Sequence, residues 1–191
     1  MKRILSLILA ALLCLTLAAC GETQPEQTPT TTTTQAVDPA ITVEDFTWEL
    51  TTEKEGKDTY MAFTFQNNSD FTLESFKLKF KDKPDATKAQ LDAYWADLKK
   101  SQNDDTDIDE MRAALEVNGT GLLLFGKTEE PVAPGKKATV RCVLNDQMES
   151  RNVIHPELYT PYMMELTYRE GDTTYYIRYN FDKEKYFCDV M

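Results

Sequence analysis

The sequence predicts a mainly β protein, an antiparallel β-sandwich with a short helical insertion around residues 84–117. The strands are predicted by strict alternation of apolar and polar residues through 162–168 and again through 175–181, because a period of two is typical of half-buried strands. The insertion is predicted by apolar side chains that recur at helical spacing over residues 91–98. Together these patterns favour strands interrupted once by helices.

The two alternating segments are expected to form a hairpin through Gly171-Asp172, since Gly accepts the positive φ of a two-residue turn. This turn sets a register that places Glu165 opposite Arg178 on the solvent face. The apolar pairs on the other face are Tyr168 with Tyr175, Leu166 with Ile177, Met164 with Tyr179 and Tyr162 with Phe181. The same register thus pairs opposite charges on one face and apolar side chains on the other, so the sequence specifies it.

The other predicted elements rest on the same evidence, namely strand alternation, helical spacing and the residues that cap or turn the chain. A loss of phase between Leu73 and Phe76 predicts a bulge or bend in a strand over residues 71–80. Thr87 followed by Gln90 resembles a capping box at the start of a helix. Further strands are expected over 41–50, 60–65, 122–125 and 138–144, the last after a Pro134-Gly135 turn, and a second short helix is expected over 107–115.

The first 19 residues are interpreted as a lipoprotein signal peptide. Lys2 and Arg3 precede an apolar run of 16 residues, shorter than the roughly 20 that a membrane-spanning helix needs. The string Leu17-Ala18-Ala19-Cys20 ends that run and resembles the lipobox of bacterial lipoproteins. The resemblance implies that Cys20 receives a diacylglycerol and becomes the first residue after cleavage. A plain secretory signal, the alternative, would not need this cysteine.

Composition divides the rest of the chain in two. Residues 20–40 are rich in Thr and Pro without an aromatic residue, which predicts a tether between the lipid and residues 41–191, a single β-sandwich domain. Removal of the signal peptide leaves 19 Lys and Arg against 32 Asp and Glu, a formal charge of −13. We therefore expect no nucleic-acid partner, because such partners select basic surfaces.

The chain resembles the immunoglobulin-like β-sandwich lipoproteins of Gram-positive bacteria in four features. These are the lipobox, the Thr-rich tether, the Asn67-Asn68-Ser69-Asp70 turn and the Pro134-Gly135 turn before an apolar strand. The helical insertion departs from that pattern. The resemblance implies an envelope-facing binding or scaffold module, and it brings no catalytic residues with it.

Two cysteines remain in the predicted domain. An even pair in an exported protein suggests a Cys142–Cys188 disulfide. The alternative is a buried Cys142 and an unpaired Cys188, and sequence does not show the geometry that decides between them.

His155 is the only histidine, which excludes sites that need two, including the common zinc hydrolase arrangements. The chain also lacks a Gly-x-Ser-x-Gly elbow. We therefore expect His155 on a surface loop, no catalytic residues, no cofactor and no enzymatic activity.

The acidic run around residue 105 has part of the ligand spacing of a calcium loop. Asp105, Asp107, Asp109 and Glu116 occupy positions one, three, five and twelve of an EF-hand loop. Glu110 occupies the sixth position, where the sharp turn needs Gly. We expect instead a solvated loop whose acids cap a short helix, and no metal.

Tyrosine is concentrated near the C-terminus. Tyr176 is expected on the solvent face, and Tyr159 and Tyr186 lie outside the alternation, so the three are candidates for one exposed binding surface. The alternative, which we favour for each tyrosine taken singly, is packing. The sequence thus predicts a lipid-anchored, extracytoplasmic lipoprotein of the cell membrane that binds an envelope protein or a cell-wall component. The alternative is a lipoprotein that binds a solute or an ion such as Ca²⁺.

Overall fold

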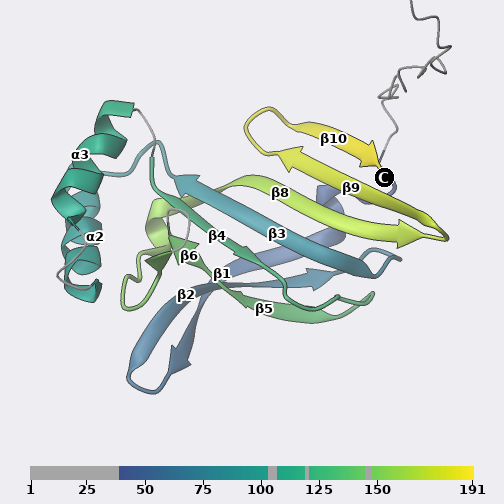
Figure 1. Cartoon of the computed structure of the whole chain (residues 1–191), viewed down its shortest axis with the longest axis horizontal. Coiled ribbons are helices and arrows are strands. Elements are labelled where there is room, and N and C mark those ends of the chain that lie inside the picture. Colours follow the sequence, from purple (N-terminus) through teal and green to yellow (C-terminus); the bar gives the residue numbers. More distant parts are fainter. Residues whose placement is uncertain (1–38, 103–106, 119–120, 145–147) are drawn as a thin grey trace, which may run out of the picture. The chain divides into compact units, whose positions relative to one another are not determined.

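The computed structural model describes residues 39–102, 107–118, 121–144 and 148–191. The mainly β prediction is confirmed, because two antiparallel sheets make up most of this part (Figure 1). The three-stranded sheet has the order β1 (Phe46–Glu55), β2 (Asp58–Asn67), β5 (Lys137–Arg141). The seven-stranded sheet has the order β10 (Lys185–Val190), β9 (Thr173–Asn180), β8 (Tyr159–Glu170), β3 (Leu73–Asp82), β4 (Leu123–Lys127), β6 (Val143–Leu144), β7 (Met148–Glu149).

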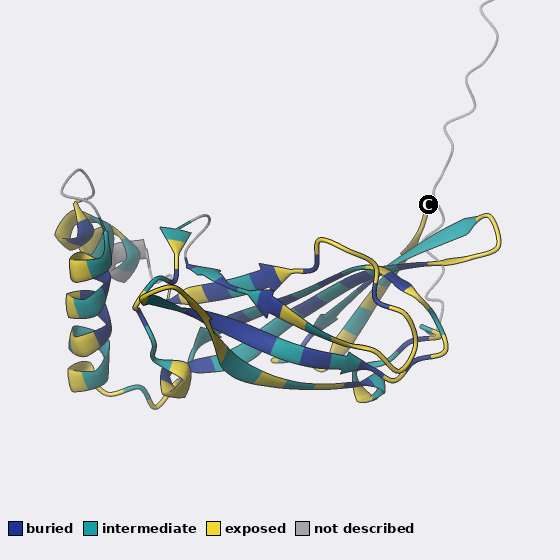
Figure 2. Cartoon of the chain, turned by 90° about the horizontal axis from the view of Figure 1, so that it is seen from below, coloured by how far each residue is buried: buried dark blue, intermediate teal, exposed yellow. Residues whose placement is uncertain are grey.

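The two sheets pack face to face through aromatic side chains. Phe65 of β2 stacks on Phe76 of β3 with ring centroids 4.1 Å apart, and Phe46 of β1 lies 4.9 Å from the same ring. Trp48 of β1 packs edge-on against Phe80 of β3 at 5.6 Å. Buried residues consequently recur along the strands, where they alternate with half-buried and exposed ones (Figure 2). This apolar interior is what makes the arrangement a sandwich.

The expected hairpin is present as β8 and β9. Leu166 lies opposite Ile177 and Glu165 opposite Arg178, and the turn contains Gly171 with φ of 58°. The predicted bulge is also present, since the pairing of β3 with β8 shifts between Leu73 and Ser75. A second shift, between Lys79 and Phe80, occurs where Phe80 pairs with Pro161, which has no N–H to donate.

The helical insertion consists of α2 (Lys88–Ser101) and α3 (Ile108–Asn118), which lie together beyond one end of the strands (Figure 1). The capping box is confirmed: the Gln90 N–H donates to Thr87 Oγ1, and the Thr87 N–H donates to Gln90 Oε1 at 2.9 Å. The side chains of Tyr94, Trp95 and Leu98 are buried, so α2 docks by the face that its spacing predicted.

Two expected strands differ from the structure. Residues 41–50 do not form one strand, because Val43–Asp45 makes a 3₁₀ turn, η1, in which Asp45 Oδ2 accepts the Thr42 N–H at 2.7 Å. The expected strand over 138–144 is divided at Cys142. The Cys142 N–H donates to the Met61 carbonyl oxygen in the three-stranded sheet at 2.8 Å, whereas Val143 pairs with Phe125 in the other sheet. The chain therefore changes sheets at this cysteine.

Candidate functional site

The three candidate tyrosines do not form one surface. Tyr159 is only 4% exposed, because the helical insertion covers the start of β8 and the Tyr159 ring packs 6.4 Å from Tyr94 of α2. The Tyr186 hydroxyl accepts the Val43 N–H at 2.7 Å and thereby holds η1. Tyr176 is half-buried, with the Arg178 guanidinium 5.7 Å from its ring centroid. The candidate surface therefore loses Tyr159, and the packing alternative describes all three, since each ring has a packing partner.

His155 does not project from an exposed loop, so that expectation was also wrong. The residue immediately precedes the 3₁₀ turn η2 (Pro156–Leu158), and its side chain is 13% exposed. Nε2 lies 3.0 Å from Asp97 Oδ2 of α2, and Nδ1 lies 3.3 Å from Glu157 Oε1. Because both ring nitrogens meet carboxylates, the imidazole joins α2 to η2.

Cys142 and Cys188 are free thiols, so of the two alternatives the structure shows a buried Cys142 and an unpaired Cys188, not the disulfide. Cys188 is on β10, whereas Cys142 immediately precedes β6, and four strands of the seven-stranded sheet separate β10 from β6. Strands about 4.8 Å apart place the two cysteines well beyond the ~7 Å Cα separation that a disulfide spans. Burial raises the pKa of the Cys142 thiol to about 12, which keeps it protonated and unreactive.

The acidic run is only partly covered by the structure. Asp105 and the side chain of Glu116 lie outside the described residues. Asp107 Oδ1 accepts the Glu110 N–H at 2.9 Å and caps α3, and Asp109 forms an ion pair with Lys99. Within the described ranges, no group of three or more His, Cys, Asp or Glu side chains could hold a metal ion.

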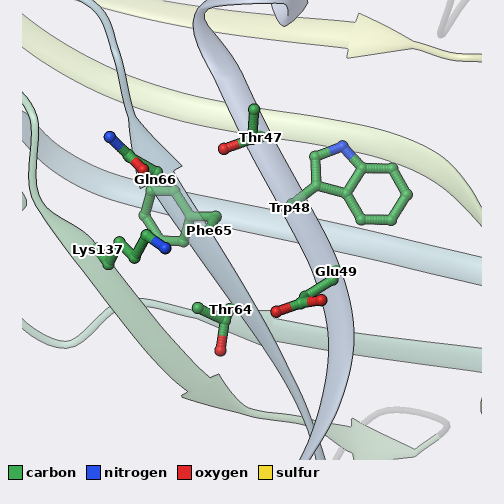
Figure 3. A pocket seen from close by; sticks show the side chains of 7 residues that line it. All are labelled: Thr47, Trp48, Glu49, Thr64, Phe65, Gln66 and Lys137. Carbon is green, nitrogen blue, oxygen red and sulfur yellow. The ribbon is translucent and has the colours of Figure 1, made fainter.

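A small recess marks the outer face of the three-stranded sheet (Figure 3). Its volume is about 170 Å³. Its lining residues are Thr47, Trp48, Glu49, Thr64, Phe65, Gln66 and Lys137. The Trp48 ring is directed away from Lys137 and toward the sandwich interior. The surface of the recess is polar and apolar in nearly equal parts.

A larger hollow, which we call the edge groove, lies between residues 127–133 and residues 136–141. Its volume is about 470 Å³. Strand β5, along one wall, is an edge strand of the three-stranded sheet. The side chains of Val132, Ala138 and Val140 line the groove and reach the sandwich core. The groove thus combines an apolar lining with the backbone edge of a strand.

The wall formed by residues 127–133 is fixed by hydrogen bonds to β3 and to the end of β2. Val132 exchanges two backbone hydrogen bonds with Leu73, at 3.0 and 2.9 Å. Thr128 Oγ1 accepts the Phe76 N–H at 3.0 Å. The buried Asn67 side chain donates to the Val132 carbonyl oxygen at 2.9 Å. A wall held at several points is preorganised, so a ligand need not order it.

The edge groove is lined by charges of both signs, with cations in excess, in a protein of formal charge −11. Its two acidic residues, Glu129 and Glu130, are exposed on the wall formed by residues 127–133. Lys127, Lys136 and Lys137 are exposed and line the groove, and none of the three has an ion-pair partner among the described residues. Arg141 differs, because its guanidinium contacts Glu53 and Glu55 at 3.1 and 3.0 Å. The excess positive charge is on the β5 side, where Lys136 and Lys137 favour an anionic group.

The sequence contains part of this site, since Pro134-Gly135 marks the turn and Lys136-Lys137 marks a basic pair. It gives no signal that β5 is an edge strand, because that depends on which strands pair. Comparisons with protein families, with curated proteins and with solved structures found no match to the chain. Neither α2 nor α3, nor any other described helix, is long and apolar enough to cross a membrane.

Proposed function

We propose that the protein is a lipid-anchored, extracytoplasmic lipoprotein, of the immunoglobulin-like type its sequence resembles, whose β-sandwich binds another envelope component without catalysing a reaction. The edge groove is the observation that carries the binding role. It is the larger of the two hollows described above, its wall is fixed by hydrogen bonds, and its lysines are unpaired within the described chain.

The anchor is supported by Leu17-Ala18-Ala19-Cys20 after a short basic and apolar segment. Two acyl chains hold a protein stably at a membrane where a single chain does not. Cells that express the protein should incorporate an alkyne-tagged fatty acid into it, and Cys20→Ala should abolish the label. Cys14→Ala is the matched control and should keep the label. Equal labelling of both variants would refute the anchor.

Binding at the groove can be tested in intact cells with a photo-crosslinking amino acid. Placed at Lys137 on the rim, it should yield a discrete adduct with an envelope component. Placed at Lys57, an exposed lysine in the β1–β2 turn, it should yield none. The same adducts from both positions, or none from Lys137, would count against the groove as a binding site.

The solute- or ion-binding alternative has weaker support. The recess of about 170 Å³ is smaller than the roughly 300–1,000 Å³ of typical small-molecule sites. Asp107 already caps α3, and Asp109 already forms an ion pair with Lys99. Melting curves with and without millimolar calcium test the ion version, and coincident curves would exclude it.

A further inference from the structure

We propose that the edge groove takes a short, extended, acidic peptide segment, which adds to β5 as a further antiparallel strand. This inference rests on the proposed binding role and names the class of partner. Strand addition to a free sheet edge is a general mode of peptide recognition, in which main-chain hydrogen bonds provide affinity and side-chain contacts provide specificity.

The direction of the backbone groups in β5 follows from its pairing with β2. The Cys142 N–H donates to the Met61 carbonyl oxygen, and the Asn67 N–H donates to the Lys136 carbonyl oxygen. Hydrogen-bonded pairs alternate along an antiparallel ladder, so the even-numbered residues of β5 point their N–H and C=O groups at β2. The amides and carbonyls of Lys137 and Thr139 therefore point away from β2, toward the groove.

The side chains of β5 alternate between two surfaces. Ala138 and Val140 face the core, whereas Lys137 and Thr139 are exposed on the outer face. Residues directly opposite each other on antiparallel strands project from the same face. A peptide strand on β5 would therefore place every second side chain beside Lys137 on the outer face and the others against the apolar lining. The favoured pattern is acidic, apolar, acidic.

Charge selects the acidic residues at the outer positions. Lysines on an edge strand ordinarily discourage pairing with other chains. Here Lys136 and Lys137, on the β5 side of the groove, have no ion-pair partner among the described residues, whereas Glu129 and Glu130 lie on the opposite wall. The two lysines repel basic strands and favour a strand whose acidic side chains lie on the β5 side, away from the two glutamates.

Both ends of the groove limit the length of the segment. The Pro134-Gly135 turn closes one end, with φ of 71° at Gly135. At the other end the backbones approach closely, since a Cβ at Gly126 would lie 3.0 Å from the Arg141 carbonyl oxygen. The space between them suits about three or four extended residues, at about 3.4 Å each.

The test is a titration of the whole protein, purified in detergent, with fluorescein-labelled pentapeptides. The probe is Glu-Val-Glu-Val-Glu, and its comparison peptides are Lys-Val-Lys-Val-Lys and an acidic peptide whose valines are replaced by prolines. We expect the first alone to bind, more weakly at higher salt. Equal binding of the basic peptide or of the proline peptide would overturn the inference.

A backbone variant separates strand addition from charge attraction. Thr139→Pro removes the N–H that points into the groove, and proline is tolerated where an edge strand has no partner for it. Thr139→Val is the control, because it keeps the N–H and loses only the hydroxyl, which lies 2.9 Å from Thr64 Oγ1. With the fold verified by circular dichroism, the proline variant should bind the acidic peptide about fivefold more weakly or worse. Equal affinities of the two variants would contradict strand addition.

Reversal of charge provides a second route if Thr139→Pro does not fold. The double variant Lys136→Glu, Lys137→Glu should lose the acidic peptide and gain the basic one, and an unchanged preference would overturn the inference. Crosslinking at Lys137 keeps the two proposals distinguishable. An adduct in cells without peptide binding in solution would support the proposed binding function and refute only the proposal that its ligand is an acidic strand.

Discussion

Asn67 and Val132 lie 65 positions apart in the sequence and are joined by a 2.9 Å hydrogen bond from the Asn67 side-chain amide to the Val132 carbonyl oxygen. The same amide donates to the Phe71 carbonyl oxygen, and Asn67 Oδ1 accepts from Ser69. One buried side chain therefore ties the turn after β2 to a wall of the edge groove.

Substitution of Asn67 should lower the stability of the protein. Asn67→Ala removes these bonds from a fully buried position and leaves buried polar groups with fewer partners. We expect the free energy of unfolding to fall by about 2–3 kcal/mol, measured by urea denaturation. Asn68→Ala, at the exposed neighbouring residue, is the control and should change it by less than about 0.5 kcal/mol. Similar losses in both variants would contradict this role.

Gly126 is required where the two sheets meet. A Cβ there would lie 2.8 Å from Val140 Cγ1 and 2.9 Å from Phe63 Cε1. We expect Gly126→Ala to destabilise the protein by about 1–3 kcal/mol, because packed side chains must shift. A double-mutant cycle with Val140→Ala tests the cause. Removal of Cγ1 should relieve part of the Gly126→Ala effect, and strict additivity would argue against the clash.

Removal of two different tyrosine hydroxyls should have opposite effects on the stability of the protein. The Tyr94 hydroxyl is buried near the Tyr159 hydroxyl, and neither makes a hydrogen bond of good geometry to a described residue, whereas Tyr186 accepts the Val43 N–H. Tyr94→Phe should therefore leave thermal stability unchanged or raise it slightly, because a buried polar group without a partner is unfavourable. Tyr186→Phe should lower stability by about 1 kcal/mol. Differential scanning calorimetry compares them, and the reverse order would contradict the assignment.

Alkaline pH should destabilise the fold. Burial raises the pKa of Tyr94 and of the Cys142 thiol to about 12 each, above their unfolded values of about 10 and 8.5. A raised folded-state pKa contributes stability that is complete below the unfolded pKa and disappears as pH rises through the folded value. The free energy of unfolding should decline from about pH 8.5 toward pH 12. Urea denaturation across this range measures it.

The same burial makes the two thiols distinguishable. Cys188 is half-buried whereas Cys142 is fully buried, so iodoacetamide should modify Cys188 first in the folded protein. The control is Cys188→Ala, whose remaining Cys142 should react only on unfolding. Rapid modification of Cys142 in the native protein would contradict its burial.

Local patterns predicted the elements whose partners are close in sequence. The β8–β9 register followed from one two-residue turn and the alternation on either side of it, and the start of α2 followed from Thr87 and Gln90. Contacts between distant segments were not predictable in this way. Tyr159 was a candidate for the surface because nothing near it in sequence indicates that Tyr94 of α2 covers it.

The sequence by itself determined the mainly β class, the hairpin register and the helical insertion, because each depends on side-chain periodicity, a turn or a cap within a few residues. Only the tertiary structure decided that the chain changes sheets at Cys142, that Cys142 and Cys188 lie too far apart to bond, and that β5 forms the wall of a groove. These features depend on which strands become neighbours. That choice is made by the joint burial of aromatic side chains such as Phe65 and Phe76 from both sheets.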